Sequence, residues 1–317
     1  MKHLLSIEQT ATEDLQSILA SAAEMKAQRG KHQRLPLDGQ TWAMIFSKSS
    51  TRTRVSFETG IRELGGWVMF LSNKDIQMGR GEPIEDTARV MGRMVHGAVF
   101  RTFAQSDVEK FAEYSGIPTI NALTDEEHPC QILTDLFTIQ EKLGDYRNKV
   151  VTFVGDGACN VPVSWIFAAA KLGFELRIAA PKEFQPASEV LHRAGAETVS
   201  SISTLGMSGT FASGGSVLIT ADLNAAAEGA DVLYTDTLVS MGKEEEAADR
   251  ISALHDYQIN NALLEKANPD ALVMHCLPAY RGKEIAADTM EAHAKTIFDQ
   301  AENRLHTQKA ILAWLVS

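Results

Sequence analysis

Short apolar runs alternate with longer amphipathic stretches along the first half of the chain. The short runs predict buried strands at residues 41–46, 67–71, 97–101 and 119–121. In the stretches between them, apolar side chains recur every three or four residues, a spacing typical of helices. These stretches predict helices over residues 14–29, 50–64 and 84–94. The alternating order favours an α/β fold built on a parallel sheet with helices on both faces.

The second half of the chain repeats this alternation after a long helix that follows Pro129. Gly144 lies just past that helix and predicts its end. Further strands are predicted at residues 150–154, 176–180, 217–221, 232–236 and 272–276. Further helices are predicted over residues 164–172, 187–194 and 302–315. The segment 204–216 is rich in glycine and serine and predicts a mobile loop.

We therefore expect two α/β domains, each a parallel sheet flanked by helices, joined by interdomain helices. The boundary near Gly144 gives a first domain of residues 1–144 and a second of residues 145–301. We expect the C-terminal helix, 302–317, to return to the first domain. A length of 317 residues fits two domains.

Composition and charge exclude several classes of protein. Hydrophobic residues make up 44% of the chain and the net charge is -11, which argues against nucleic-acid binding. The chain has no apolar run near the length of a membrane span, and its first residues do not resemble a signal peptide. Cys130, Cys159 and Cys276 are isolated from one another. We therefore expect a cytoplasmic protein without a disulfide framework or a zinc site.

The string Ser50-Thr51-Arg52-Thr53-Arg54 follows a predicted strand and opens a predicted helix. A helix start offers unpaired N–H groups and a partial positive charge, and hydroxyl and guanidinium groups add donors for an anion. Open α/β sheets bind ligands at the carboxyl ends of their strands, where this string lies. Taken alone, the string fits a capped surface helix with solvated arginines better. The motifs further along the chain favour a phosphate site.

Three further strings carry polar groups suited to a small substrate: His128-Pro129-Cys130-Gln131, Ser240-Met241-Gly242 and His275-Cys276-Leu277-Pro278. Each also has an ordinary structural interpretation. His128 before a proline fits a helix cap, Cys276 a small buried apolar residue and Met241 core packing. Arg101 fits a surface arginine at a strand end, and Asp236 fits a turn cap.

The ordered set of motifs resembles the aspartate/ornithine carbamoyltransferase family. Residues 50–54 followed by 128–131 are similar to the transcarbamoylases, which move a carbamoyl group from carbamoyl phosphate. Asp236 before residues 240–242, with residues 275–278 further on, narrows the resemblance to the ornithine carbamoyltransferases. The resemblance covers nearly the whole chain. It also includes Gln77, residues 86–94 and residues 302–307.

The resemblance implies a role for individual residues in two sites. The implied carbamoyl phosphate site consists of Ser50, Thr51, Arg52, Thr53, Gln77, Arg101, His128, Gln131, Cys276, Leu277 and Arg304. The implied ornithine site consists of Asn160, Asp236, Ser240 and Met241. The residues implied in catalysis are Arg101, His128, Asp236 and Cys276.

The implied reaction forms L-citrulline and phosphate from carbamoyl phosphate and L-ornithine. It needs no redox cofactor and no covalent enzyme intermediate, because the phosphate is already a leaving group, and no metal ion is expected. The δ-amine resembles that of lysine, with a pKa of about 10.4, so it must lose a proton before it attacks. Either Cys276, with Asp236 beside it, or water accepts this proton. Gln77 resembles a glutamine that reaches into a neighbouring subunit's site, which implies a homo-oligomer, a trimer by resemblance.

Two departures from the family pattern bear on these expectations. Many relatives have two adjacent asparagines where this chain has Cys159-Asn160. The loop 78–83 differs from the more common basic version.

Rival functions come from the same family and from other classes of protein. The nearest is a transcarbamoylase acting on putrescine, an acylated ornithine or aspartate. Asp236 with residues 240–242 favours a free α-amino acid over the first two, and aspartate would call for extra cationic residues for its second carboxylate. A dinucleotide-dependent dehydrogenase is disfavoured because Asn160 stands where the GxGxxG fingerprint needs its third glycine. A non-catalytic relative should have lost part of the set that this chain keeps, Arg52, Arg101, His128 and Cys276.

Overall fold

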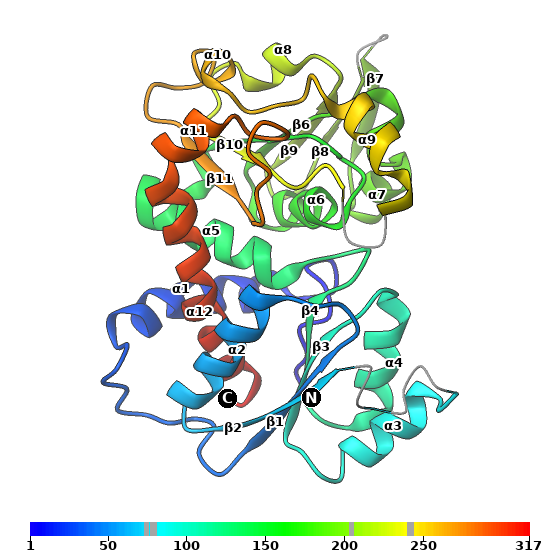
Figure 1. Ribbon diagram of the computed structural model, residues 1–317, viewed down its shortest axis with the longest axis vertical. Helices are drawn as coiled ribbons and strands as arrows, with labels where there is room; N and C mark the ends of the chain where they lie inside the picture. The colour runs from blue at the N-terminus through cyan, green and yellow to red at the C-terminus, as the bar shows by residue number, and fades with distance from the viewer. Residues whose placement is uncertain (73–75, 77–80, 203–205, 240–243) are drawn as a thin grey trace. The chain divides into compact units, whose positions relative to one another are not determined.

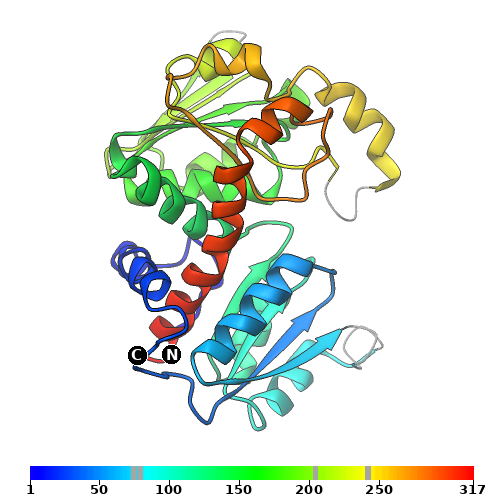
Figure 2. The same ribbon diagram turned by 60° about the vertical axis from the view of Figure 1, so that its left-hand side comes forward.

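The computed structural model divides the chain into two compact units (Figure 1) and describes residues 1–72, 76, 81–202, 206–239 and 244–317. The first unit comprises residues 1–137 and 302–317, and the second comprises residues 138–301. The division falls within helix α5 (Pro129–Leu143) and within helix α12 (Ala294–Leu315). Both chain ends belong to the first unit (Figure 2), where the Lys2 ammonium donates to the Ser317 hydroxyl at 2.9 Å.

The first unit is built on a four-stranded parallel sheet in the order β2-β1-β3-β4. Its strands are β1 (Thr41–Phe46), β2 (Trp67–Ser72), β3 (Gly97–Arg101) and β4 (Thr119–Leu123). Its complete helices are α1 (Thr12–Ala27), α2 (Thr51–Glu63), α3 (Ile84–Met91) and α4 (Gln105–Ser115). Helix α2 lies on one face of the sheet, and α3 and α4 lie on the other, where Ile45, Phe100 and Phe111 share one buried cluster.

This strand order places a topological switch point between β1 and β3. The chain runs from β1 outward to β2 and then returns past β1 to β3, so the connecting helices α2 and α3 lie on opposite faces. Open α/β sheets bind ligands outside the carboxyl ends of the strands at such a point. Ser50 follows β1 and Arg101 ends β3, so two of the sequence candidates lie at this edge.

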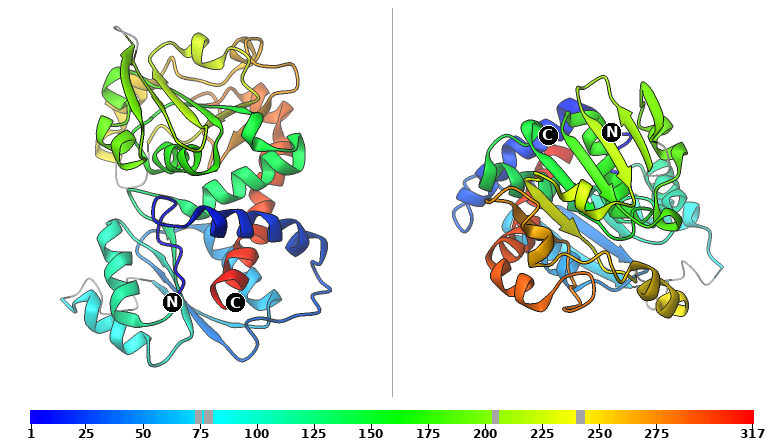
Figure 3. Two further views of the ribbon diagram at one scale, coloured as in Figure 1. Left: turned by 180° about the vertical axis from the view of Figure 1, so that it is seen from behind. Right: turned by 90° about the horizontal axis from the view of Figure 1, so that it is seen from above.

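The second unit is built on a seven-stranded sheet in the order β11-β10-β5-β6-β9-β8-β7 (Figure 3). Its strands are β5 (Val150–Val154), β6 (Glu175–Ala179), β7 (Thr198–Ile202), β8 (Gly206–Thr210), β9 (Ser216–Thr220), β10 (Val232–Thr235) and β11 (Leu272–His275). Its complete helices are α6 (Asn160–Leu172), α7 (Ser188–Arg193), α8 (Leu223–Ala227), α9 (Ala247–Leu254), α10 (Asn261–Leu264) and α11 (Ala287–Ala292). Buried Val154, Leu233 and Val273, from β5, β10 and β11, share one core cluster.

The loop expected at 204–216 is wrong over residues 206–210, which form β8, and at residue 216, which begins β9, whereas residues 211–215 connect these strands. Strand β8 runs antiparallel to both β7 and β9, so this sheet is mostly, not wholly, parallel. A Cβ atom on Gly206 would lie 1.7 Å from the Ile219 carbonyl oxygen, and one on Gly215 would lie 2.3 Å from that of Ala169. The glycines therefore allow close backbone packing in a hairpin, which the composition alone does not distinguish from mobility.

Several short helices were not predicted, whereas the bounds of β1, β3 and β5 are confirmed. Helix α4 lacks the usual start signal, because Ala104 at its N-cap makes no side-chain hydrogen bond. Helices α8 and α9 are 5 and 8 residues long, too short to show a clear helical period. Helix α12 begins at Ala294, upstream of the predicted start. Among the described residues, none of the helices combines the length and the apolar character needed to span a bilayer.

Candidate functional site

The start of α2 lies at the carboxyl edge of the first sheet. The backbone of Ser50 is extended, and its Oγ accepts a hydrogen bond from the Thr53 amide at 3.2 Å, which confirms the predicted cap. Thr51 is exposed in the first turn. Arg54 turns away to the sheet, where its guanidinium lies 3.7 Å from the centroid of the Phe70 ring. The start of α2 therefore presents backbone N–H groups at the edge where β1 ends.

Arg304 links this helix start to α5 from the far end of the chain. Its Nη2 donates to Thr53 Oγ1 at 2.7 Å, and its Nη1 donates to Gln131 Oε1 at 2.9 Å. Gln131 in turn donates through Nε2 to Asp135 Oδ1 at 2.8 Å, which fixes which end of its amide faces Arg304. Thr53, Gln131 and Arg304 are all buried. The fold thus gathers three sequence candidates from α2, α5 and α12 within the first unit.

Two further candidates, Arg101 and His128, complete a cationic cluster that we define as Arg52, Arg101, His128 and Arg304. Arg101 is 4% exposed at the end of β3, and His128 is 3% exposed just before α5. Burial lowers the pKa of His128 well below its usual value, and the charges of Arg304, Arg101 and Arg52 lower it further. These three guanidinium groups therefore lie close enough to act on one imidazole. His128 is neutral near pH 7, so its ring offers a hydrogen-bond donor without adding charge.

Cys130, between His128 and Gln131, belongs to the core instead. It is fully buried, and its thiol donates to the Asn121 carbonyl at 3.4 Å. Burial raises the pKa of this thiol to about 12, so it carries no thiolate near neutral pH. Its place in the motif is explained by packing.

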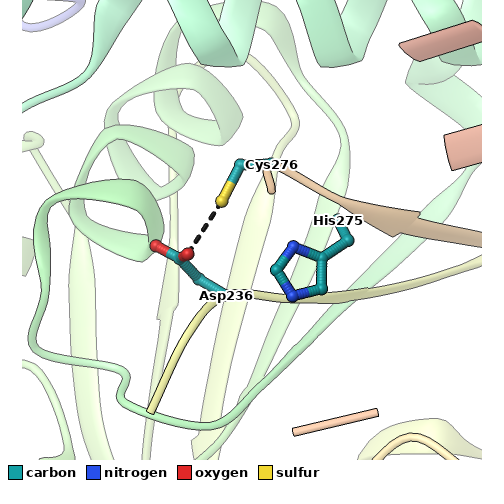
Figure 4. Close-up of side chains that lie close together, drawn as sticks. All are labelled: Asp236, His275 and Cys276. Carbon is teal, nitrogen blue, oxygen red and sulfur yellow. Dashed lines mark hydrogen bonds between the residues drawn. The ribbon is translucent and has the colours of Figure 1, made fainter. Parts of the chain in front are cut away.

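A second group of candidates lies at the carboxyl edge of the second sheet. Strands β10 and β11 are parallel neighbours, and their register pairs Thr235 with His275. Asp236 and Cys276 each follow those paired residues directly, so they lie side by side (Figure 4). The Cys276 thiol donates to Asp236 Oδ1 at 2.8 Å, and the same oxygen accepts from the Thr237 amide at 2.7 Å.

His275 stands next to this pair, and together Asp236, His275 and Cys276 bring three possible metal ligands within 4.8 Å of one another. The histidine ring already has other partners. Its Nδ1 accepts from the Leu277 amide at 2.8 Å, and its Nε2 lies 3.2 Å from Glu284 Oε1, with both side chains fully buried. The arrangement suits a side chain that holds the following turn better than one that ligates an ion.

Asn160 and a buried ion pair occupy the neighbouring strand end. Asn160 opens α6 beyond the turn that follows β5, and β5 adjoins β10 in the sheet. Asp156, in that turn, pairs with Arg250 of α9, which also donates to the Leu238 carbonyl at 3.2 Å. Burial raises the pKa of Asp156, and Arg250 partly offsets this effect. The loops after β5 and β10 are thereby tied to α9.

The structure therefore brings the candidates into two groups, one in each unit. The described first-unit candidates are Ser50, Thr51, Arg52, Thr53, Arg101, His128, Gln131 and Arg304. The described second-unit candidates are Asn160, Asp236, Cys276 and Leu277. Gln77, Ser240 and Met241 lie outside the described residues.

Family comparisons match these two halves of the chain separately. A family described as the carbamoyl-P binding domain of aspartate/ornithine carbamoyltransferase matches residues 2–141. A second, described as the Asp/Orn binding domain, matches residues 147–315. The chain belongs to the aspartate/ornithine carbamoyltransferase family. The resemblance seen in the sequence motifs is confirmed.

Relatives named ornithine carbamoyltransferase match this family member along almost its whole length. The protein from Akkermansia muciniphila is 53% identical over 317 residues, covering 99% of this chain and 98% of its own. That from Wolinella succinogenes is 46% identical over 316 residues, with the same coverage.

Solved structures confirm the two-domain α/β fold. Ornithine carbamoyltransferase from Pyrococcus furiosus has a TM-score of 0.88 at 40% identity and covers 98% of this chain and 96% of its own. Anabolic ornithine carbamoyltransferase from Campylobacter jejuni has a TM-score of 0.88 at 40% identity and covers 99% of both chains.

Sequence reasoning did not assign a role to His275, Glu284, Arg250 or Lys48. His275 lies in the motif at residues 275–278, and its place near the end of a predicted strand could have indicated a functional position. No sequence signal pointed to Glu284 or Arg250, because their partners are known only once the fold is known. Lys48 directly precedes the serines of the first motif and pairs with Asp125.

The buried neutral state of His128 predicts a specific loss of stability in acid. The unfolded chain takes up a proton near the usual pKa of about 6.5, whereas folded His128 does not until lower pH. Between pH 7 and 5, the free energy of unfolding should therefore fall more steeply for the wild type than for His128→Gln, by up to about 1.4 kcal/mol per pH unit.

Urea titrations at each pH measure this difference, and His192→Gln, at an exposed position of α7, controls for the loss of an imidazole. Parallel slopes for the wild type and His128→Gln would contradict the assignment of a buried neutral ring.

Proposed function

We propose that this chain transfers the carbamoyl group of carbamoyl phosphate to the δ-amine of L-ornithine, giving L-citrulline and phosphate. The observation that carries the proposal is the cationic cluster, together with the bridge from Arg304 to Thr53 and Gln131. Arg52, Arg101 and His128 lie within the stretch that matches a carbamoyl-P binding domain, and Arg304 lies in the stretch that matches the Asp/Orn binding domain. The names of the relatives support ornithine as the acceptor.

The proposed carbamoyl phosphate site occupies the first domain, residues 1–144 with helix 302–317. Its phosphate meets Ser50, Thr51, Arg52 and Thr53 at the start of α2, and Gln77 is the contact that a neighbouring subunit would supply. Backbone N–H groups at a helix start and charged guanidinium groups both favour an anion. Arg52, Arg101 and Arg304 provide fixed positive charge in a chain whose net charge is -11.

The carbamoyl group meets hydrogen-bond donors and acceptors of the same site. Arg101, His128 and Thr53 donate to the carbonyl oxygen, which becomes negative in the tetrahedral state. Pre-aimed donors of this kind are each worth about 3 kcal/mol. Gln131 faces Arg304 with its Oε1, and this oxygen is the atom that can also accept from the carbamoyl NH₂.

The proposed ornithine site occupies the second domain, residues 145–301. Asp236 and Ser240 suit the α-ammonium group, while Asn160 and the Met241 backbone suit the α-carboxylate. Cys276 and Leu277 lie in the turn that faces both substrates in the family pattern. The carboxylate of Asp236 favours a diamino acid over aspartate, because aspartate would bring a second negative charge against it.

The attacking amine must lose a proton, and the Cys276–Asp236 pair offers a route for it. The thiol already donates to Asp236 Oδ1. As Sγ accepts the amine proton, the thiol's own proton can pass along the existing hydrogen bond to the Asp236 carboxylate. Loss of the proton to water before binding is the alternative, and the two routes differ in their dependence on Cys276.

The function is tested by measuring citrulline formation from carbamoyl phosphate and ornithine. Putrescine, N-acetylornithine and aspartate, assayed in parallel, represent the other transcarbamoylases. We expect turnover with ornithine to exceed that with each of the others. A faster reaction with any of these three would transfer the proposal to that acceptor, and no reaction with all four would reject it.

Arg52→Ala should abolish turnover chiefly through loss of carbamoyl phosphate binding. The substitution removes one of the three guanidinium groups that surround His128. Calorimetric titration with carbamoyl phosphate and with inorganic phosphate measures the effect. Arg62→Ala, on the exposed end of α2, is the control. Saturation by carbamoyl phosphate at the wild-type concentration would contradict the phosphate site.

Cys276→Ala should lower the maximal rate, by about 10²-fold or more if the thiol takes part in proton transfer, and leave carbamoyl phosphate binding intact. The dependence of kcat on pH, compared between the variant and the wild type, separates the two proton routes. Cys130→Ala is the control, because its buried thiol is explained by packing. A wild-type rate across the pH range would remove Cys276 from the proton path.

We also propose a homotrimer with shared sites in the cytoplasm, where all three cysteines would remain thiols as they are here. Edge strand β2 supports an oligomer, because Trp67 is 71% and Met69 46% exposed on the same face. Sedimentation should give the mass of three chains, and Trp67→Glu should shift it towards one. A fully active monomer of the wild type would contradict this proposal.

A further inference from the structure

Lys48 is a buried lysine in the turn between β1 and the cap of α2. Its side chain is 4% exposed, although lysine is rarely buried without a partner. Its ammonium group donates to Asp125 Oδ1 and lies 4.3 Å from the centroid of the Phe103 ring. The two partners come from different loops. Lys48 therefore makes its contacts across the carboxyl edge of the first sheet.

The contact between Lys48 and Asp125 crosses the end of β3, unlike the backbone hydrogen bonds at this edge. Because β3 lies between β1 and β4, the ends of β1 and β4 are separated by two strand spacings, about 10 Å. Among the described residues, the backbone hydrogen bonds at this edge link neighbouring segments, as between the Ser47 amide and the Arg101 carbonyl at 2.7 Å. The Asp125 amide likewise reaches the Phe103 carbonyl at 2.8 Å. Lys48 joins the two outer loops directly and passes the Phe103 ring between them.

Each of the three loops carries part of the proposed carbamoyl phosphate site. The β1 loop leads into Arg52, the β3 loop begins at Arg101, and the β4 loop leads into His128. We propose that Lys48 is a positioning residue that fixes the separation of the β1 and β4 loops, through Asp125 and Phe103, and so holds the carbamoyl phosphate site in its binding geometry. This inference rests on the proposed function.

Arg304 supports the same geometry from the helix side. It bridges Thr53 of α2 and Gln131 of α5, which are the helices that follow the β1 and β4 loops. Lys48 bridges those loops one step earlier in the chain. Two cations thus hold the same pair of segments, but Arg304 is itself proposed to contact the substrate. The ammonium group of Lys48 already contacts Asp125 and Phe103. We therefore expect Lys48 to affect substrate binding by positioning the loops.

The burial pattern makes Lys48 suitable for substitution. Asp125 is 59% exposed, so Lys48→Met leaves a solvated carboxylate and an apolar chain of similar length in the buried space. Asp125→Ala breaks the same link while keeping the lysine. The pair Lys142 and Asp299, in the second unit, is a matched control because it is also a close lysine–aspartate contact, with side chains 20% and 31% exposed.

The experiment measures binding of inorganic phosphate by calorimetry and the KM values for carbamoyl phosphate and ornithine. Lys48→Met and Asp125→Ala should each weaken phosphate binding and raise the KM for carbamoyl phosphate, by about 10-fold or more. The KM for ornithine should stay unchanged. The double variant should be no worse than Lys48→Met, because both substitutions remove one link. Lys142→Met should match the wild type.

Other outcomes would overturn the inference in distinguishable ways. Weak binding by Lys48→Met with normal binding by Asp125→Ala would mean that the lysine charge acts on the ligand directly. Additive effects in the double variant, or an equal loss in Lys142→Met, would rule out a specific link. If Lys48→Met fails to fold, Asp125→Ala alone decides by the same criteria. Absence of phosphate binding by the wild type would reject the proposed function as well.

Discussion

The first unit depends on holding three guanidinium groups around one buried imidazole. Like charges at short range repel most strongly where water is excluded, so this arrangement needs compensation. Hydrogen bonds from Arg304 to two neutral oxygens, Thr53 Oγ1 and Gln131 Oε1, compensate part of this repulsion. His128 contributes by staying neutral, so that it adds a donor but no fourth charge. In the proposed site, a phosphate dianion would add negative charge beside these guanidinium groups.

The two units place their candidate residues by the same rule, with different means of fixing them. In each sheet the residues lie just beyond the carboxyl ends of adjacent parallel strands, about 4.8 Å apart. In the second unit, the register of β10 and β11 is enough to put Asp236 beside Cys276. In the first unit, the residues come from strands and helices that are not all neighbours. Long charged side chains therefore complete the connection there.

The sequence predicts the parts of this structure that depend on local pattern. The cap at Ser50 follows from a serine between a strand and an arginine-rich helix, and the strand ends follow from apolar runs bounded by polar turns. The hairpin around β8 was missed because glycine and serine occur both in mobile loops and where backbones approach closely. The short helices were missed because they contain too few turns to show a period.

The contacts within the candidate sites depend on the whole fold and are much harder to predict. Arg304 and Thr53 are 251 positions apart, and no local rule pairs them. The family resemblance pointed to both residues but not to the bond between them. Lys48 and Asp125 are both ordinary polar residues in the sequence, and their link appears only when the strand order is known.

The turn after β11 is held by hydrogen bonds that the short motif does not reveal. Leu277 adopts a φ of 60°, which costs a residue other than glycine about 1–2 kcal/mol. Its amide donates to His275 Nδ1, and that bond requires the tautomer with its proton on Nε2. The Oε1 atom of buried Glu284 accepts a hydrogen bond from His275 Nε2–H and so selects this tautomer. His275 therefore holds the turn that follows it, and this turn places the Cys276 thiol against Asp236.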